Sequence, residues 1–310
     1  MSFLEIRNLS ARVKGSHAKL LRDVSLSVSA GEVRGLVGES GAGKSMIGKA
    51  ILGTLPTSVE ITSGQILLNG EKLRRTRIGA SCALIPQDPL TALNPSRRIG
   101  PQITDRLVDI LGWGRSAAEA RARDLLAEVH IPDPARVLRA YPHELSGGMR
   151  QRILIASAFA AEPKLIVADE PTTALDVTVQ KQILKLIAEM QARHGTALLF
   201  VTHDLGVVAE TVDRVVVMYA GRVVEIGPVA DVIHKPAHPY TVGLMGGGGG
   251  LMEATHMFEA VQARFLATQS PRQLTMLHAL GIGDKKTKGM NCFAHEGLVK
   301  RVIGGHWVWS

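Results

Sequence analysis

Alternating apolar and polar residues mark the beginning of the chain. The stretches "FLEIRNLSARV" (3–13) and "LLRDVSLSVSAG" (20–31) alternate in this way, which predicts two strands of a half-buried antiparallel sheet. A short apolar run, "EVRGLVG" (32–38), ends in glycine and predicts a buried strand, and "KSMIGKAILGTL" (44–55) has the spacing of a helix. The N-terminal part therefore predicts two antiparallel strands, followed by a strand, a glycine-rich loop and a helix.

Continuous apolar runs dominate the middle of the chain. Both "KLIVADEP" (164–171) and "TALLFVTHD" (196–204) are typical of parallel strands buried on both faces. Helical spacing covers 115–130 and 177–195, and Gly195 ends the second of these helices. The stretch "RVVVMYAGRVVEIG" (214–227) predicts a hairpin that turns at Ala220-Gly221. Strands and helices that alternate in this order predict an α/β fold, with an antiparallel start and a helical insert at about 90–160.

Composition limits the kinds of partner. The 310 residues suffice for one large domain or two ordinary ones, and a net charge of +8 favours anionic partners. Only 4% of the residues are aromatic, which leaves little surface for stacking on bases, so no nucleic-acid partner is expected. Two distant cysteines argue against a disulfide framework. The N-terminus has no signal-peptide pattern and no apolar run is long enough to span a bilayer, so any membrane role is expected to be peripheral.

The loop between the third strand and the first helix predicts a phosphate site. Its sequence "GESGAGKS" (38–45) fits the pattern G-x-x-x-x-G-K-[ST], in which backbone N–H groups surround phosphate oxygens. Lys44 is expected to bridge the β- and γ-phosphates, and the Ser45 hydroxyl to bind Mg²⁺. The alternative is a glycine-rich turn that matches by chance. The residues expected to contact the nucleotide are Gly38, Glu39, Ser40, Gly41, Ala42, Gly43, Lys44 and Ser45.

Two acids end the apolar strand "LIVADE" (165–170). We expect Asp169 to hold the Mg²⁺ shell and Glu170 to polarise a water for attack on the γ-phosphate. The alternative is an ordinary polar end of a strand, and the phosphate loop makes the catalytic interpretation the stronger one.

A further segment, "LSGGMRQR" (145–152), resembles the signature motif of ATP-binding-cassette (ABC) ATPases. By itself it could be a serine cap that opens a helix. The resemblance implies a P-loop NTPase with a RecA-like core, an N-terminal antiparallel β subdomain and a helical signature subdomain. It also implies that Ser146, Gly147 and Gly148 contact the γ-phosphate of an ATP bound to a second subunit, so that two chains enclose two ATP molecules head to tail.

Three more positions match this family in order. Gln87 in "IPQDP" resembles the glutamine that senses Mg²⁺ and the attacking water, and that faces the transmembrane partner. Asp176 in "TALD" resembles an aspartate at the subunit contact. His203 in "VTHD" resembles the histidine that contacts the γ-phosphate, although a lone histidine after an apolar strand is more often structural.

Two longer stretches narrow the resemblance. Residues 87–95, "QDPLTALNP", and 225–241, "EIGPVADVIHKPAHPYT", are similar to ATPase subunits of dipeptide, oligopeptide and nickel importers. The resemblance covers about 3–245 and assigns 1–245 to one ATP-binding domain. It implies a peripheral ATPase at the cytoplasmic face of the inner membrane. Its expected partners are two permease subunits, a second ATPase subunit (a copy or a paralogue) and, indirectly, an extracytoplasmic solute-binding protein.

One position departs from the family pattern. The family places an aromatic residue near the end of the first strand, where it stacks on adenine, and the matching position here is Val13. If stacking on adenine resembles stacking on nucleic-acid bases, its loss costs about 1–3 kcal/mol. Weaker nucleotide affinity or looser base selectivity is therefore expected, with the chemistry retained.

The residues after the glycine run are unlike those before it. Residues 246–310 resemble part of a class I CoA-transferase, most clearly in "FAHEGLVKRVIGGHW" (293–307). The glutamate that carries CoA in that family belongs to a later part of its fold, so we interpret this segment as an incomplete and inactive fragment on a glycine joint. The leading hypothesis is thus an ATPase subunit of a peptide-type importer. The alternatives are a soluble, non-transport ABC ATPase and a CoA-transferase.

Overall fold

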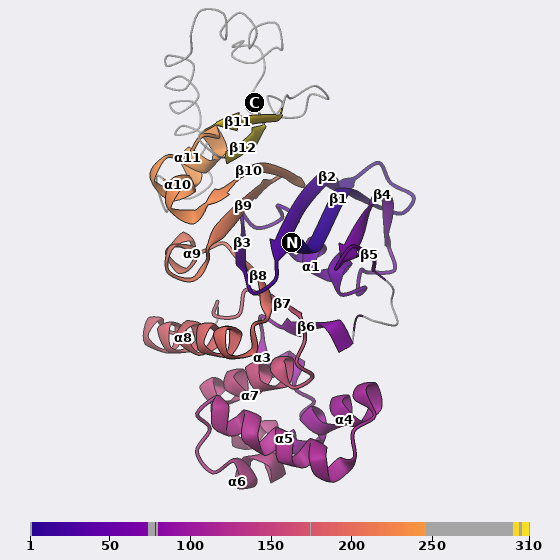
Figure 1. Cartoon of the computed structure of the whole chain (residues 1–310), viewed down its shortest axis with the longest axis vertical. Coiled ribbons are helices and arrows are strands. Elements are labelled where there is room, and N and C mark those ends of the chain that lie inside the picture. The colour runs from indigo at the N-terminus through magenta and orange to yellow at the C-terminus, as the bar shows by residue number, and fades with distance from the viewer. Residues whose placement is uncertain are drawn as a thin grey trace, which may run out of the picture.

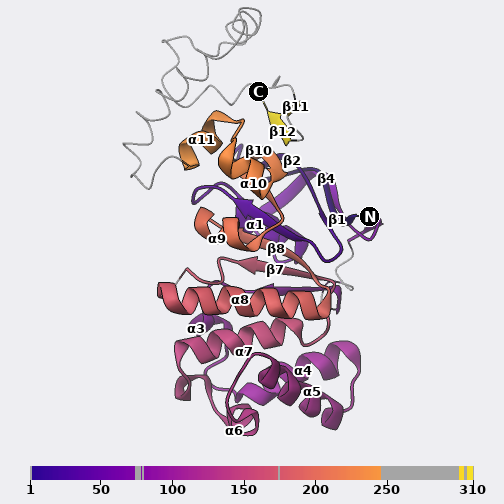
Figure 2. The same cartoon turned by 60° about the vertical axis from the view of Figure 1, so that its left-hand side comes forward.

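The computed structural model describes residues 2–73, 78, 80–173, 175–245, 300–303 and 306–309. Two sheets occupy its upper part and a group of helices lies below them (Figure 1). The turned view shows α8 (Val177–His194) lying between the central sheet and that lower helical group (Figure 2). The chain thus forms a mixed α/β core with a separate helical part, as the sequence predicts.

The central sheet is built around parallel strands. Its order is β11-β12-β10-β9-β3-β8-β7-β6 in the described part of the chain. β3 (Val33–Val37) lies between β8 (Ala197–Thr202) and β9 (Arg214–Tyr219), and β7 (Leu165–Asp169) pairs with β6 (Cys82–Ile85). All six residues of β8 are buried, which explains its uninterrupted apolar sequence.

A second, antiparallel sheet covers the N-terminal end of the fold. Its order is β2-β1-β4-β5, formed by β1 (Ser2–Val13), β2 (Lys19–Ser29), β4 (Val59–Leu68) and β5 (Glu71–Lys72). The inward-facing residues of β1 and β2 pack with α1 (Lys44–Ile51) and with one face of the central sheet in one apolar core. This packing fixes the position of α1, and with it the loop that precedes α1.

The helical part follows β6 in sequence. It contains α3 (Pro89–Ala92), α4 (Ile99–Leu111), α5 (Arg115–Glu128), α6 (Pro134–Arg139), a short 3-10 turn at Pro142–Glu144 and α7 (Gly147–Phe159). Its buried side chains join the core beneath the other face of the central sheet. α7 leads into β7, and its first turn lies at the surface of the helical part, where Ser146 and Gly147 are exposed.

The C-terminal elements surround one edge of the central sheet. β10 (Arg222–Pro228) turns back on β9, and α9 (Leu205–Thr211), α10 (Val229–His234) and α11 (Pro239–Met245) lie nearby (Figure 1). Farther along the chain, β11 (Lys300–Ile303) and β12 (His306–Trp309) form a hairpin that extends the sheet at β10. The helix at 254–268 and the strand at 273–280 that the sequence suggests lie outside the described residues.

The strands and helices that the hydrophobic pattern predicts within residues 2–245 are present. The hairpin turn lies at Ala220 and Gly221, both with positive φ, and Gly195 ends α8 in a left-handed conformation. The first helix is shorter than expected, since α1 ends at Ile51 and not at Leu55. Neither β4 nor β6 was predicted, because β4 is largely exposed over its first half and β6 has only four residues.

Candidate nucleotide site

The predicted phosphate loop joins the end of β3 to the start of α1. Gly38 has φ 149°, and a Cβ there would lie 2.2 Å from the Met218 carbonyl oxygen, so only glycine fits against β9. Gly43 has φ 101° and caps α1, where a Cβ would crowd Leu21 at 3.0 Å. Both glycines allow the loop to curl tightly ahead of the helix N-terminus, and that is the geometry an anion site needs.

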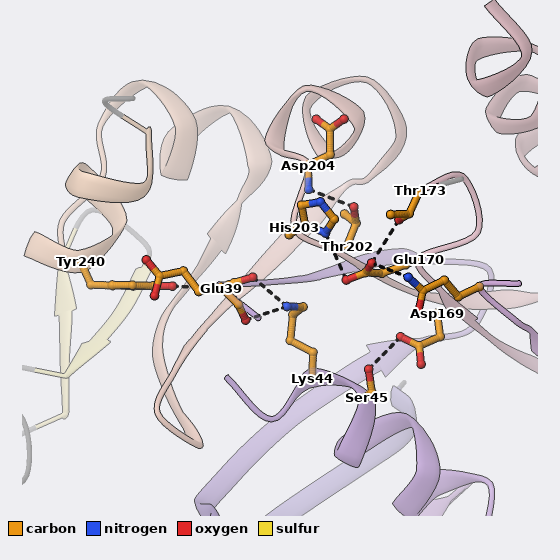
Figure 3. Close-up of polar contacts among 12 residues, drawn as sticks. Glu39, Lys44, Ser45, Asp169, Glu170, Thr173, Thr202, His203, Asp204 and Tyr240 are labelled. Atoms are coloured by element: carbon orange, nitrogen blue, oxygen red, sulfur yellow. Dashed lines mark hydrogen bonds and ion pairs between the residues drawn. The ribbon is translucent and has the colours of Figure 1, made fainter. Parts of the chain in front are cut away.

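Neighbouring segments hold the loop in place from outside. In the turn between β9 and β10, Gly221 donates its N–H to the Ala42 carbonyl at 3.0 Å. From α11, the Tyr240 hydroxyl oxygen accepts the Glu39 N–H at 3.0 Å (Figure 3). The loop is thus tied to two segments that are about 200 residues away in sequence.

The Lys44 ammonium lies inside the loop. Its Nζ donates to the carbonyl oxygens of Gly38 at 2.7 Å and Glu39 at 2.9 Å, and the residue is only 5% exposed (Figure 3). Burial lowers the pKa of Lys44, while the nearby carboxylates of Glu170 and Asp169 act in the opposite direction. A cation held among backbone groups in this way is placed to receive a negatively charged ligand.

Two oxygen groups meet beside the loop. The Ser45 hydroxyl donates to Asp169 Oδ1 at 3.1 Å, and Asp169 is the last residue of β7 (Figure 3). Burial raises the pKa of the Asp169 carboxyl, and the hydrogen bond from Ser45 counteracts this rise. A hydroxyl and one carboxylate, with ligand phosphates to complete the shell, are the donors that Mg²⁺ usually takes in nucleotide sites, so these residues fit a magnesium ion.

Glu170 lies at the centre of a group of polar side chains. Its φ is 48°, a left-handed conformation that is uncommon for a residue with a Cβ and that often marks functional positions. Gln87 Nε2 donates to its carboxylate at 3.2 Å, and Thr173 Oγ1 donates at 3.1 Å. His203 Nδ1 lies 3.1 Å from the other carboxylate oxygen (Figure 3). Three of the predicted site residues, on separate segments, therefore converge.

The signature segment lies apart from this group. Ser146 caps α7, with its hydroxyl accepting the Met149 N–H at 3.3 Å. In the described part of the chain it makes no hydrogen bond to residues 38–45. Among the described residues, a Cβ added at Gly147 would meet nothing within 4 Å and one at Gly148 only Val179 at 3.9 Å, so the first turn of α7 is open. Asp176 is also exposed, and its carboxylate caps α8 through the Thr178 and Val179 N–H groups.

Sequence reasoning missed two residues of the site. Thr173 lies in the "TALD" segment and donates a hydrogen bond to Glu170, which is three residues earlier in the sequence. Because the two residues are so close in sequence, a tight turn after β7 is a signal from which this contact can be predicted. Tyr240 belongs to the "HPYT" stretch that indicates the importer subfamily, but nothing in that pattern connects it with the phosphate loop. The contact appears only when α11 is placed against the end of β3.

The segment around Tyr240 contains a buried histidine that should make stability depend on pH. His238 is 1% exposed, its Nδ1 accepts the Tyr240 N–H at 3.1 Å, and burial lowers its pKa to about 3. The unfolded chain binds this proton near the ordinary value of 6.5, whereas the folded chain does not. The stabilisation that comes from keeping His238 neutral is therefore fully present above about pH 6.5. As the pH drops from there towards 3, the free energy of unfolding falls by about 1.4 kcal/mol per pH unit.

The variant His238→Asn, compared with wild type, should show a shallower loss of unfolding free energy between pH 6.5 and about pH 5. Urea unfolding at several pH values measures this slope. The exposed His17 gives a matched control, since His17→Asn should leave the slope unchanged. Equal slopes for both variants and wild type would show that His238 is not the source.

Taken together, the phosphate loop, the Ser45–Asp169 pair and the acid at the strand end define a P-loop nucleotide-binding protein. A model of the family described as "ABC transporter" matches residues 21–173. The chain belongs to the ATP-binding proteins of the ABC transporter family.

The individual relatives agree with this assignment. The chain is 51% identical over 253 residues to a probable D,D-dipeptide transport ATP-binding protein, DdpD, of Escherichia coli (strain K12), over 78% of this chain and 77% of that protein. It is 46% identical to the dipeptide transport ATP-binding protein DppD of the same strain, over 79% of this chain and 78% of the other. Among solved structures, cbiO1 from Clostridium perfringens, part of the ABC transporter complex cbiONQ, is similar with a TM-score of 0.67, 26% identity and coverage of 83% and 99%.

Proposed function

We propose that this chain hydrolyses ATP as the motor subunit of an ABC importer for a peptide-like solute, a dipeptide or oligopeptide, with nickel as a further candidate. The observation that carries the ATPase proposal is the convergence of Gln87 and His203 on Glu170, next to the Ser45–Asp169 pair. The peptide-like solute is proposed because relatives of 51% and 46% identity are named as dipeptide transport ATP-binding proteins.

In the proposed reaction, the phosphates lie against the loop 38–45. Lys44 leaves the two carbonyl groups that it now binds and neutralises the β- and γ-phosphates. Ser45 and Asp169, together with Gln87, would hold Mg²⁺, which would supply charge neutralisation at the phosphates. Glu170 orients the attacking water and accepts its proton, and His203 contacts the γ-phosphate.

The proposed site needs a second subunit. Ser146, Gly147 and Gly148 would present a hydroxyl and backbone N–H groups to the γ-phosphate of an ATP on the partner, and Asp176 would lie at the same contact. Support comes from the open first turn of α7 and from the exposure of Asp176. The N-terminus of a helix favours negative charge, so an approaching phosphate is stabilised there. The partner is a copy of this chain or a paralogue.

The permease contact is proposed at the segment after Gln87. Leu90, three residues on, is a large apolar side chain with 64% of its surface exposed, and its helix α3 packs against α7. A permease bound there would be connected to Glu170 through the Gln87 hydrogen bond.

Among the described residues, none of the helices combines the length and the apolar character that crossing a bilayer requires. The chain is proposed to lie at the cytoplasmic face of the inner membrane, on two permease subunits that receive solute from an extracytoplasmic binding protein.

The C-terminal segment is proposed to have a different origin from the rest of the chain. Residues 1–245 form the ATP-binding domain, with the helical part at about 90–160, and 246–310 are proposed to be a catalytically inactive, incomplete piece of a CoA-transferase joined through glycines. The support is the likeness of 293–307 to that family, and the β11–β12 hairpin of this segment pairs with β10 of the central sheet.

Membrane association tests the importer role. Expressed together with the permease subunits of a dipeptide importer from its own source, the chain should sediment with membranes and be released by detergent with the permeases. Without those subunits the same chain should stay in the supernatant. Recovery in the supernatant under both conditions would favour an ABC ATPase that does not take part in transport.

A further inference from the structure

The segment that follows the last strand of the ATP-binding fold reaches back to the phosphate loop. We propose that Tyr240, in α11, is a positioning residue for nucleotide binding, acting through the backbone of Glu39. The proposal rests on the proposed function of the loop, and it adds a residue that none of the loop, acid, glutamine, signature or histidine motifs contains.

Glu39, in the phosphate loop, makes hydrogen bonds through both its backbone N–H and its backbone carbonyl. The Glu39 N–H donates to the Tyr240 hydroxyl oxygen at 3.0 Å, and the Glu39 carbonyl accepts the Lys44 ammonium at 2.9 Å (Figure 3). Glu39 itself is exposed, so its side chain does not anchor it in the protein interior. The Glu39 N–H shares its peptide group with the Gly38 carbonyl, which accepts the Lys44 ammonium at 2.7 Å, so Tyr240 fixes one of the two peptide groups that the phosphate-binding lysine contacts.

Tyr240 is itself well anchored. It is 6% exposed, and its ring lies against that of Tyr219, with the centroids 4.5 Å apart. Burial raises the pKa of its hydroxyl, which therefore stays neutral. A tyrosine ring with two packed faces holds its hydroxyl in one place at little entropic cost.

The residues before Tyr240 are fixed by a buried carboxylate. Glu225 of β10 is fully buried and accepts the N–H groups of Ala237 at 2.9 Å and His238 at 3.0 Å. The His238 ring then accepts the Tyr240 N–H at 3.1 Å. A chain of hydrogen bonds thus runs from β10 in the central sheet through 237–240 to the phosphate loop, so the loop is supported by the rigid sheet and not by a free terminus.

The position of Tyr240 predicts which kinetic constant it controls. Gln87, Thr173 and His203, which surround Glu170, come from the loops that follow β6, β7 and β8, and among the described residues none of them has a hydrogen bond to Tyr240. In Figure 3, Tyr240 approaches Glu39 from the side away from Glu170. When Lys44 leaves the Glu39 carbonyl for a phosphate, that carbonyl still accepts the Ala42 N–H within the loop at 3.2 Å, and the Tyr240 hydroxyl still holds the Glu39 N–H from outside the loop. Loss of the hydroxyl should therefore weaken ATP binding and leave turnover at saturation nearly unchanged.

The neighbouring residue provides a matched control. Thr241 is fully buried, and its hydroxyl has no hydrogen-bond partner in the described part of the chain. Tyr240→Phe and Thr241→Val each remove one buried hydroxyl from α11 with little change in shape. Only the first removes a hydrogen bond to the phosphate loop.

The experiment measures the KM of ATP hydrolysis, kcat, and the Kd for ATP of both variants and wild type. Tyr240→Phe should raise the KM and the Kd by about three- to tenfold, the range expected for one lost hydrogen bond, with kcat within about twofold of wild type. Thr241→Val should match wild type. A Tyr240→Phe protein with the KM and Kd of Thr241→Val, or with a kcat loss at unchanged KM, would overturn the proposal.

A second measurement does not depend on activity. In the nucleotide-free wild type, the Glu39 amide should exchange with solvent much more slowly than an unprotected amide, and Tyr240→Phe should remove this protection. Fast exchange of Glu39 in wild type would also overturn the proposal. If the wild type bound no ATP at all, the proposed function would fail while the exchange result would still report on the Tyr240 contact.

Discussion

Glu170→Gln should bind ATP as tightly as wild type and lose turnover by about 10²- to 10⁴-fold. The amide keeps the size of the side chain and can still accept the hydrogen bonds from Gln87 and Thr173, but it cannot take a proton from water.

Lys44→Ala should behave differently from Glu170→Gln, because it removes the only ammonium in the loop 38–45 and weakens ATP binding itself. Titration with ATP and steady-state phosphate release separate the two effects.

Glu162 gives the matched control for this change. It also has a left-handed backbone conformation, with φ 49°, but its side chain is 66% exposed and makes one ion pair with Arg121 at 3.7 Å. Glu162→Gln should hydrolyse ATP like wild type. Normal hydrolysis by Glu170→Gln would show that the proton acceptor has been assigned to the wrong residue.

Gly147→Asp should abolish turnover without preventing ATP from binding to the single subunit. A Cβ added at Gly147 meets nothing within 4 Å among the described residues, and an acid in the first turn of a helix is favourable, so folding should be preserved. In the dimer, however, its charge would oppose the γ-phosphate on the partner subunit. We expect the ATP-dependent dimer to disappear and hydrolysis to fall by at least about 10²-fold.

Gly114 is the control for that variant. It precedes α5 as Gly147 begins α7, its φ is negative, and a Cβ there also meets nothing within 4 Å. Gly114→Asp should fold, dimerise with ATP and hydrolyse it normally. Light scattering with and without ATP measures the dimer. An active, dimeric Gly147→Asp protein would exclude the first turn of α7 from the catalytic contact.

The sequence was sufficient for those parts of the site that lie within one short segment. The loop 38–45 carries its own glycines, lysine and helix start, and β7 ends at Asp169, directly before Glu170, so spacing alone predicted where these residues lie in the fold. The hydrophobic pattern likewise predicted β3, β7 and β8, because buried parallel strands have continuous apolar sequences. Resemblance to a family, and not spacing, pointed to Gln87 and His203.

The rest depends on tertiary contacts. Gln87 and Glu170 are 83 residues apart in sequence, and Glu39 and Tyr240 are 201 apart, and no local pattern encodes either hydrogen bond. β4 was missed because its first half is exposed and lacks the apolar alternation of β1. The role proposed for Ser146 requires a second chain, since among the described residues its hydroxyl only caps α7.

A crystal structure of Glu170→Gln with ATP and Mg²⁺ tests the central claim directly, because this variant should hold the nucleotide without hydrolysing it. We predict a two-fold dimer in which each γ-phosphate lies between Lys44 of one protomer and Ser146 of its partner. A nucleotide bound by one protomer alone, or bound away from the loop 38–45, would contradict this interpretation.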